Sequence, residues 1–265
     1  MAEIGARHWV AAVRIDQPDE DGGRADDADT PDANEAHDAD AAGGSGDAGR
    51  ERAVPAASAG EHEAYRARVD AVFRVYAIDQ AYERVREIER GTVTPALKRI
   101  EAEDPERRLA GLEHSLKGKD RLTEKINEAV DERGHTVDQA FAMVKDAIRY
   151  TFCYPENRYA EGVHADCGRL ESAGFEHVDR RNLWAGEEYK GVNSRWRVPG
   201  SGQLFEVQFH TQASLDAKEE THGAYEQIRS LPEDDAEVGK LHGYQREVTA
   251  KIPIPPGAPG IPDYP

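Results

Sequence analysis

The sequence is poor in cysteine and has no long hydrophobic run. Only Cys153 and Cys167 occur among its 265 residues, so no disulfide framework can form, and a reducing compartment is the default. Their spacing matches no zinc site without further ligands. No apolar stretch approaches the roughly 20 residues of a membrane span, and charges and Trp9 interrupt the place where a signal peptide needs an apolar core. These absences predict a cytoplasmic protein with no membrane partner, unless a separate system exports it.

The chain also lacks a basic excess. Its formal net charge is −18, which argues against a general nucleic-acid binder. Residues 1–60 carry 14 acidic and five basic side chains, or half of this net charge. The rest is therefore only mildly acidic and leaves room for a local basic pocket. Residues 16–60 are rich in Asp, Ala, Gly and Pro without a hydrophobic period, so we expect residues 1–60 to be mostly disordered.

Beyond residue 60 there is no internal repeat, no Walker A motif and no G-x-G-x-x-G. The spacing of apolar residues predicts one long helix, or two in succession, at 61–90, a break at 91–95, a further helix to about residue 103, and a short helix begun by Asp104-Pro105. Farther on, it predicts helices at 136–146, 159–173, 214–230 and 235–251, and strands at 149–154, 175–184, 189–198 and 204–209. A turn at 199–202 would join the last two strands in a hairpin.

The strand at 204–209 carries the first functional pattern. Its odd-numbered residues are apolar, whereas the even-numbered ones from 206 on are polar: Glu206, Gln208 and, just beyond the strand, His210. A pleated strand sends the two sets to opposite faces, so the three polar side chains would line one surface. A carboxylate, an amide and an imidazole in file suit metal binding or proton transfer. A half-exposed strand with a solvated polar face explains the pattern equally.

A second pattern is the cation-rich segment ahead of the helix that contains Leu122. Four cations gather there: Lys117, Lys119, Arg121 and Lys125. Cations around a glycine at a helix start suit a polyphosphate, and a solvated basic face is the alternative. Asp146 and Arg149 lie at the next predicted helix–strand junction, where groups that touch a ligand are often found.

Taken together, these motifs resemble the synthetase domain of the RelA/SpoT family of nucleotide pyrophosphokinases, and above all the domains of this kind at the C-termini of actinobacterial polymorphic toxins. Lys117 and Lys125 match the lysines of the family's Arg-x-Lys-x-x-x-Ser-x-x-x-Lys loop and helix. Arg149 matches the arginine of its Asp-x-x-Gly-x-Arg strand, and Gly191 and Ser194 match its Gly-Tyr-x-Ser-x-His motif.

The resemblance covers about residues 111–230 together with the proline-rich end of the chain. The family's Glu-x-Gln-x-x-Thr strand is matched in full at 206–211, and its Ala-x-x-Glu-His at 217–222 with one residue inserted. Several motif positions differ, among them four with a named role: Ser115 stands for the arginine, Arg121 for the serine, Val144 for the metal-binding aspartate and Val192 for the tyrosine that stacks on a guanine acceptor. Asp146 is the carboxylate nearest to Val144. An aliphatic side chain stacks poorly on a base, so Val192 argues against GDP or GTP as acceptor.

The resemblance implies an α/β (α+β) fold, with a nucleotidyltransferase-like mixed sheet flanked by helices and a helical N-terminal extension. It implies a helical extension at 61–110, the synthetase domain at 111–252 and a proline-rich tail at 253–265. The implied activity is an ATP-dependent transfer of pyrophosphate to the 3′-hydroxyl of an acceptor nucleotide, as in alarmone synthesis. A growth-inhibiting toxin with an antitoxin or immunity protein as partner is implied as well.

The motifs also imply roles for individual residues. Asp146 and Glu206 would hold Mg²⁺, Glu206 would accept the proton of the acceptor's 3′-hydroxyl, and Gln208 would complete the catalytic group. The ATP-binding cations would be Lys117, Lys119, Arg121, Lys125 and Arg149. The acceptor-binding residues would be Arg180, Arg181, Lys190, Asn193, Ser194, His210 and His222.

Several alternatives stay open. The acceptor is an adenine or guanine nucleotide or the 3′ end of a tRNA, of which the acidic balance disfavours the last. The replaced motif positions favour a degenerate domain that binds nucleotide or a partner without turnover, whereas the intact Glu206 and Gln208 oppose it. An NAD-dependent ADP-ribosyltransferase toxin also uses a glutamate on a strand, but it would give the phosphate-loop lysines no role.

Overall fold

The computed structural model describes residues 58–265. The disorder predicted at 1–60 therefore falls outside the described residues except for its last three, and there the structure differs. Ser58 caps a helix that begins at Ala59, because its side chain accepts from the backbone of Glu61 and the Glu61 carboxylate accepts from the backbone of Ser58. At residues 58–60 a capped helix start therefore replaces the disorder that the composition predicts.

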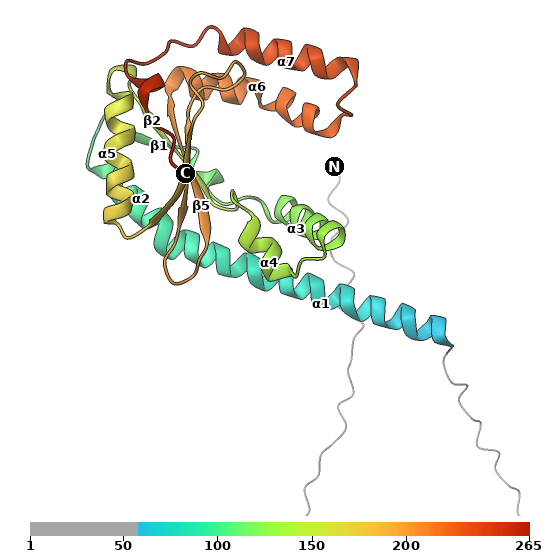
Figure 1. Cartoon of the computed structure of the whole chain (residues 1–265). Helices are drawn as coiled ribbons and strands as arrows, with labels where there is room; N and C mark the ends of the chain where they lie inside the picture. Colours follow the sequence, from blue (N-terminus) through green and yellow to red (C-terminus); the bar gives the residue numbers. More distant parts are fainter. Residues whose placement is uncertain (1–57) are drawn as a thin grey trace, which may run out of the picture. The chain divides into compact units, whose positions relative to one another are not determined.

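Five strands form one mixed sheet, as expected (Figure 1). They are β1 (Arg108–Ala110), β2 (Arg149–Tyr154), β3 (Glu176–Asn182), β4 (Val192–Arg197) and β5 (Leu204–Thr211). Their order across the sheet is β1-β2-β5-β4-β3. The central strands β2 and β5 run parallel, and all other neighbours run antiparallel. The predicted hairpin at 199–202 is confirmed, since it joins β4 to β5.

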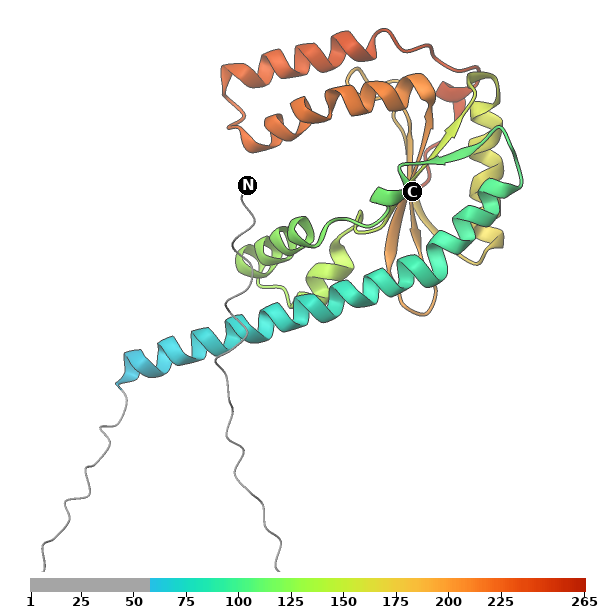
Figure 2. The same ribbon diagram turned by 180° about the vertical axis from the view of Figure 1, so that it is seen from behind.

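Helices lie on both sides of this sheet (Figures 1 and 2). They are α1 (Ala59–Ile88), α2 (Thr94–Ala102), α3 (Lys119–Arg133), α4 (Val137–Met143), α5 (Tyr159–Ser172), α6 (Gln212–Ser230) and α7 (Ala236–Thr249). Among residues 58–265, each helix is too short or too polar to cross a membrane. Helix α6 follows β5 directly and begins with a capping interaction between Thr211 and Ser214.

One face of the sheet is apolar and forms the core. Alternate residues of β2, β5 and β4, such as Phe152, Val207 and Trp196, are fully buried there. Helix α5 and the second half of α1 with α2 share this core, to which Ile78 and Leu97 belong. The opposite face of the same strands carries Arg149, Glu206 and their polar neighbours. Strand alternation therefore separates a core face from a face that is free for chemistry.

The helix break predicted at 91–95 is wrong. Helix α1 passes through a π-helical turn, η1 (Glu89–Val93), directly into α2. Pro95 lies in the first turn of α2, directly after the π turn, where the hydrogen-bond pattern changes from π-helical to α-helical. Glu89 and Val93 are buried in the π turn, so packing stabilises a helical path that the Gly and Pro residues alone would not favour.

The short helix predicted at Asp104-Pro105 is also wrong. Asp104 forms a turn instead, in which its Oδ1 accepts from the backbone N–H of Glu106 at 3.0 Å. The chain then enters β1, which pairs with β2. The sheet therefore starts before residue 111, inside the segment that the sequence assigns to a helical extension.

The proline-rich tail is held against the edge strand β3. Backbone bonds join Tyr264 and Arg180 in both directions, at 3.0 and 3.2 Å. The side-chain amide of Asn182 donates to the carbonyls of Ala258 at 2.9 Å and Ile261 at 2.8 Å. Because the tail pairs with an edge that would otherwise be open, it protects β3 from pairing with other chains.

Candidate functional site

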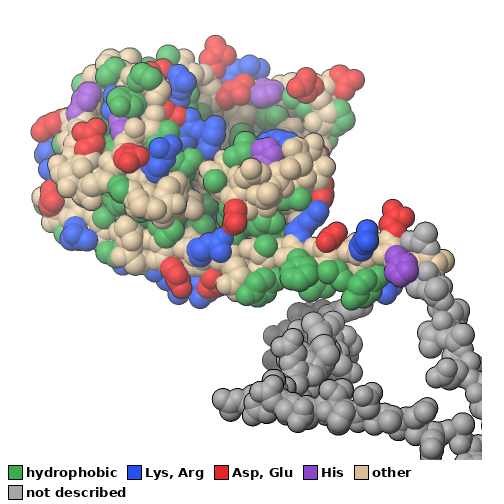
Figure 3. Space-filling model, turned by 60° about the horizontal axis from the view of Figure 1, so that its bottom comes forward, with side chains coloured by type: hydrophobic (Ala, Val, Ile, Leu, Met, Phe, Trp, Pro, Cys, Tyr) green, Lys and Arg blue, Asp and Glu red, His purple; other side chains and the backbone are tan. Residues whose placement is uncertain are grey.

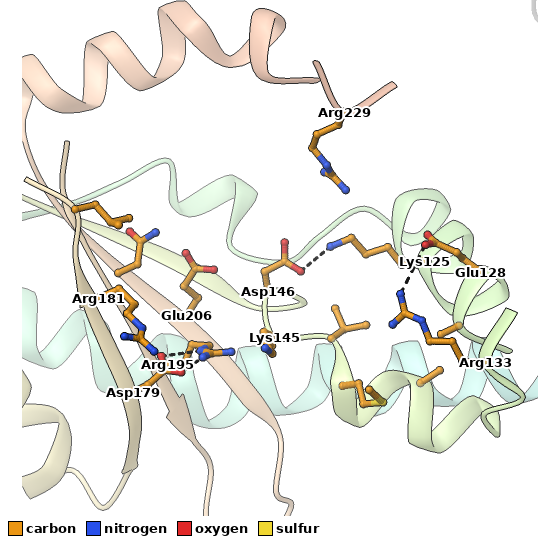
Figure 4. A pocket seen from close by; sticks show the side chains of 16 residues that line it. Lys125, Glu128, Arg133, Lys145, Asp146, Asp179, Arg181, Arg195, Glu206 and Arg229 are labelled. Carbon is orange, nitrogen blue, oxygen red and sulfur yellow. Dashed lines mark hydrogen bonds and ion pairs between the residues drawn. The ribbon is translucent and has the colours of Figure 1, made fainter. Parts of the chain in front are cut away.

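A cleft lies over the polar face of the sheet, lined by residues of α3, α6 and α7 as well as the strands. It has two adjoining lobes, a larger one of about 820 Å³ and a smaller one of about 590 Å³. Lys125, Asp146, Asn193 and Glu206 line both lobes. Figure 4 shows the smaller lobe, with Glu206 and Asp146 near each other and Lys125 reaching Asp146 from α3. Two carboxylates therefore stand where the lobes meet.

The pairing of the strands sets part of this geometry. Arg149 of β2, Glu206 of β5 and Arg195 of β4 lie side by side in register. The Arg149 Nε lies 3.5 Å from the Glu206 carboxylate, and the Arg195 Nε donates to Asp179 at 2.7 Å. Since hydrogen-bonded strands fix these neighbours, the positions of Arg149 and Glu206 relative to each other do not depend on a loop.

Asp146 is the second carboxylate of the site. The helix predicted to reach it ends at Met143, which leaves Asp146 in the short loop before β2. Its carboxylate accepts from Lys117 at 2.9 Å, from Lys125 at 3.0 Å and from Arg149 at 2.9 Å. Burial alone would raise the pKa of Asp146, but the ion pairs with Lys117 and Lys125 outweigh it and lower this pKa from 3.8 to about 2. Asp146 is therefore an anion at any physiological pH.

The loop that carries Lys117 is fixed to the start of β2. The backbone of Lys117 donates to the Ala147 carbonyl at 2.9 Å, and the backbone of Arg149 donates to the Ser115 carbonyl at 2.7 Å. The Ser115 hydroxyl points away from the cleft and donates to the buried Glu89 carboxylate at 2.8 Å. This residue therefore holds the loop in place and does not reach a ligand.

Glu206, Gln208 and Lys218 form a chain of hydrogen bonds on the wall of the larger lobe. Lys218 Nζ donates to Gln208 Oε1 at 2.6 Å, and Gln208 Nε2 donates to Glu206 Oε1 at 2.5 Å. An ammonium can only donate, so Lys218 fixes which end of the amide faces Glu206. Burial, together with the nearby Arg149, lowers the pKa of Lys218 to about 8. Sequence reasoning missed Lys218. It could have been recognised because this lysine lies on the same face of helix α6 as the buried Ser214, Ala217 and Thr221, where a cation is unusual.

Tyr189 is a second residue that sequence reasoning missed. Its hydroxyl meets Asn193 Oδ1 and His210 Nε2, each at 2.8 Å, while its partly exposed ring lines the larger lobe. His210 is fully buried and also bonds Ser214 through Nδ1 at 2.9 Å. Burial lowers the pKa of His210 to about 3, so the imidazole is neutral and supports Tyr189 from behind.

The structure brings most of the predicted site residues together. The cleft is lined by Lys117, Arg121, Lys125, Asp146, Arg149, Arg181, Asn193, Glu206, Gln208 and His222. Arg121 lies at the periphery, with a guanidinium 3.7 Å from Glu226. Val144 and Val192, at the family's aspartate and tyrosine positions, are buried, whereas the carboxylate of Asp146 and the ring of Tyr189 line the larger lobe.

Five predicted residues do not line the cleft. They are Lys119, Arg180, Lys190, Ser194 and His210. Lys119 pairs with Asp79 of α1 at 2.8 Å, and Lys190 donates to the Trp184 carbonyl at 2.9 Å. Arg180 donates to the Pro262 carbonyl at 2.9 Å, because alternation turns it to the face opposite Arg181.

Comparison with known proteins gives structural matches only. No protein-family model matches the sequence, and no curated protein matches it at a significant level. The small alarmone synthetase 1 from Bacillus subtilis, bound to its product pppGpp, has a TM-score of 0.43 and 19% identity over 64% of this chain and 88% of its own. A GTP pyrophosphokinase family protein from Streptococcus pneumoniae has a TM-score of 0.40 and 16% identity over 67% of this chain and 86% of its own.

Small alarmone synthetase 2 from Bacillus subtilis has a TM-score of 0.41 and 10% identity over 69% of this chain and 90% of its own. These structures are alarmone synthetases and pyrophosphokinases by name, the class that the sequence motifs resemble. At such identities a likeness concerns the fold and not the activity.

The donor set at the junction fits a magnesium ion that is bound together with a nucleotide. Within residues 58–265, no three His, Cys, Asp or Glu side chains gather into a metal cluster. Mg²⁺ is usually held by one or two carboxylates plus substrate phosphates and water. Asp146 and Glu206 form such a pair, and the cations now bound to Asp146 can transfer to the phosphates of a substrate.

Proposed function

We propose that the chain is a pyrophosphokinase that transfers pyrophosphate from ATP to the 3′-hydroxyl of an acceptor nucleotide. The observation that carries this proposal is the pair Asp146 and Glu206 at the junction of two lobes, each of which has its own cations. Such an arrangement suits a reaction between two polyanionic substrates, because each can be bound on its own side of the reacting centre.

The larger lobe is proposed to hold ATP. Lys117 and Arg149 belong to this lobe, Lys125 belongs to both, and all three converge on Asp146. A triphosphate offers these cations more negative charge than one carboxylate, so they would exchange Asp146 for phosphate oxygens. Mg²⁺ held by Asp146 and Glu206 would neutralise phosphate charge in the transition state.

The smaller lobe is proposed to hold the phosphates of the acceptor. Arg181 lies on its wall with Asn193 and Lys145. Figure 4 shows Arg181 beside the Arg195–Asp179 pair on the sheet, on the same wall as Glu206. His222 lines the larger lobe, and its role in acceptor binding stays a prediction.

Glu206 is proposed to be the general base. The acceptor's 3′-oxygen forms a bond to the β-phosphorus of ATP, the bond from that phosphorus to the oxygen shared with the α-phosphate breaks, and AMP leaves. The proton of the 3′-hydroxyl goes to the carboxylate of Glu206. The 2.5 Å bond from Gln208 and the nearby Arg149 hold this carboxylate in a fixed orientation.

The test is an assay with γ-labelled ATP, Mg²⁺ and separate pools of GDP, GTP, AMP, ADP, ATP and deacylated tRNA. We expect release of AMP together with a labelled acceptor, and a loss of at least about a hundredfold in Glu206→Gln. Glu233→Gln is the matched control, because Glu233 is exposed and outside the cleft. Equal turnover in both variants would refute the role of Glu206.

A binding module without turnover is the second candidate. The observation that favours it is Ser115, whose hydroxyl is bound to Glu89, so the family's arginine has no counterpart at that position in the cleft. Measured binding of ATP without release of AMP from any pool would establish this candidate instead.

A toxic role of the proposed enzyme is tested by induced expression in a bacterial host. We expect growth arrest, which Glu206→Gln should abolish and which co-expression of a cognate antitoxin should suppress.

A further inference from the structure

Helix α1 carries an apolar stripe that nothing in the described part of the chain covers. Figure 3 shows hydrophobic side chains in a row along the part of this helix that projects beyond the other helices. The large apolar residues of this part are 61 to 68% exposed and comprise Tyr65, Val72, Phe73, Val75 and Tyr76. Contiguous exposed apolar surface of this kind usually marks an interaction site.

The stripe is separate from the face by which α1 joins the core. Arg74, Ile78 and Ala81 point inward, since Ile78 and Ala81 are buried and Arg74 pairs with Asp131 of α3 at 2.6 Å. With 100° per residue, the stripe lies on the opposite side of the helix. Its apolar character therefore serves no contact within residues 58–265.

A seam with coiled-coil spacing runs along this stripe. Its positions alternate in steps of three and four residues: His62, Tyr65, Val69, Val72, Tyr76 and Asp79. Val69 is partly buried between its neighbours, and Phe73 and Val75 flank the seam. From one end to the other, the seam has a polar residue, Tyr, Val, Val, Tyr and a polar residue. The order of residue types is therefore the same in both directions. A two-fold antiparallel interface needs such self-complementarity, because each residue meets a different residue of an identical surface.

We propose that this stripe pairs with the same stripe of a second copy of the chain, with the two helices antiparallel about a two-fold axis. Tyr65 then faces Tyr76 and Val69 faces Val72, so each layer matches in size. At both ends the imidazole of His62 faces the carboxylate of Asp79, which also pairs with Lys119. A parallel pair would instead set Asp79 against its own copy, which like charges disfavour.

The residues that flank the seam support the same arrangement. In the antiparallel pair, Arg66 and Arg68 of one copy lie next to Phe73 and Val75 of the other. Arginine stems cover apolar surface while the guanidinium stays in water, and a guanidinium over an aromatic ring is attractive. The two copies bring six aromatic side chains, which puts the buried area on the order of 1,000 Å². This is near the lower limit of specific interfaces, so we expect a concentration-dependent dimer.

The first experiment measures the mass of the full chain in solution by light scattering over a range of concentrations. We expect a dimer that Val72→Glu shifts toward monomer, with a dissociation constant raised by about a hundredfold or more. Ala71→Glu is the matched control, since it adds the same charge at an exposed neighbouring position off the seam. The proposal is overturned if the chain is a monomer at every concentration. It is also overturned if Val72→Glu and Ala71→Glu change the dissociation constant equally.

The second experiment determines the direction of the helices. Chains with Tyr65→Cys and chains with Tyr76→Cys are mixed under mild oxidation; the native Cys153 and Cys167 are buried. The antiparallel pair predicts disulfides between the two variants, because position 65 faces position 76. Disulfides mainly between copies of one variant would show a parallel pair and overturn the proposed arrangement. Neither experiment depends on catalysis, so the outcome is independent of the proposed function.

Discussion

At the scale of single residues, one carboxylate balances three cations in the absence of a substrate. Asp146 accepts from Lys117, Lys125 and Arg149 at 2.9 to 3.0 Å. This arrangement keeps the cations close together, so the triphosphate of the proposed donor would meet a site that is already assembled.

Asp146 should make the unfolding free energy of the protein depend on pH in the acidic range. Its pKa is lowered from 3.8 in an unfolded chain to about 2, so its ionised form stabilises the fold above pH 4, and this contribution disappears as the pH falls toward 2. The difference corresponds to about 2 kcal/mol of unfolding free energy. Urea unfolding at several pH values, without nucleotide, should show wild type and Asp146→Asn separated by this amount at pH 7 and converging in acid. A constant separation would contradict the ion-pair account.

Lys218 should set the alkaline limit of activity. Its pKa is lowered to about 8, so the side chain is charged below this pH and neutral above it. Wild-type turnover should therefore fall above about pH 8, whereas Lys218→Arg, which stays charged, should carry activity to higher pH. Lys218→Met should lose between about tenfold and a hundredfold in kcat at pH 7, because Gln208 is no longer oriented. Lys240→Met is the control, since Lys240 is exposed and pairs only with Glu237; an unchanged pH profile in Lys218→Arg would argue against this role.

At the scale of elements, the π-helical turn η1 contacts the loop that carries Lys117 through one buried side chain, Glu89. Glu89 Oε1 accepts from Thr94 at 2.5 Å, from Ser115 at 2.8 Å and from Tyr150 at 3.2 Å. Burial raises the pKa of the Tyr150 phenol far above its usual value, so this hydroxyl remains a donor. The turn thus joins α1, the loop before Lys117 and strand β2.

Replacing Glu89 by alanine should disturb stability and ATP binding together. The three hydroxyls lose their acceptor, which should lower the unfolding free energy by about 2–3 kcal/mol. The loop of Lys117 loses its anchor at Ser115, so KM for ATP should rise. Glu87→Ala, on the exposed side of the same helix turn, is the control for helix propensity. A normal KM in Glu89→Ala would separate the turn from the site.

The tail is an element that completes the sheet from outside the predicted domain. The ring of Tyr264 stacks on His177 at 4.1 Å between centroids, and His177 stacks on Trp196 at 4.2 Å. Burial and the nearby Arg180 lower the pKa of His177 to about 4, so the stack is uncharged at neutral pH.

Asn182→Ala should release this tail. The variant lacks the side-chain amide that donates to the carbonyls of Ala258 and Ile261. The loss of these two hydrogen bonds should lower the free energy that holds the tail by roughly 1–3 kcal/mol. Limited proteolysis followed by mass spectrometry should show faster cleavage within 253–265 than in wild type, while Asn157→Ala, at an exposed position, should not change it. Equal cleavage rates would mean that Pro262, Ile261 and the stack hold the tail without Asn182.

At the scale of the whole described region, helices α1 and α2 are part of the core. Ile78, Leu97 and Ile100 pack in the same hydrophobic cluster as the strands, and β1 supplies one edge of the sheet. A fragment that begins at residue 111 should therefore fail to fold, with a disordered circular dichroism spectrum, whereas a chain that begins at residue 58 keeps these elements and should melt cooperatively. Cooperative melting of the shorter fragment would support the boundary that the sequence resemblance implies.

The strands were largely predictable because strand alternation is a local property. The predicted strand at 149–154 coincides with β2, and β5 lies where Glu206 and Gln208 alternate with apolar residues. Helix caps at Thr136 and Thr211 also depend on residues close in sequence. The break at 91–95 and the helix at Asp104 were predicted wrongly, because tertiary packing and strand pairing outweigh weak local preferences.

The sequence by itself determined which candidate site residues are present: the glutamate and glutamine of β5, Lys117 before α3, Lys125 within α3 and the arginine of β2. These residues can be recognised from the sequence because each motif spans only a few positions and does not depend on the tertiary structure. Only the tertiary structure decided which side chains share the cleft. Alternation places Arg180 and Arg181 on opposite faces, but packing decides that the Arg180 face is the covered one. Lys218 meets Gln208, and Tyr189 meets His210, through contacts between separate elements, and such contacts have no local signature in the sequence.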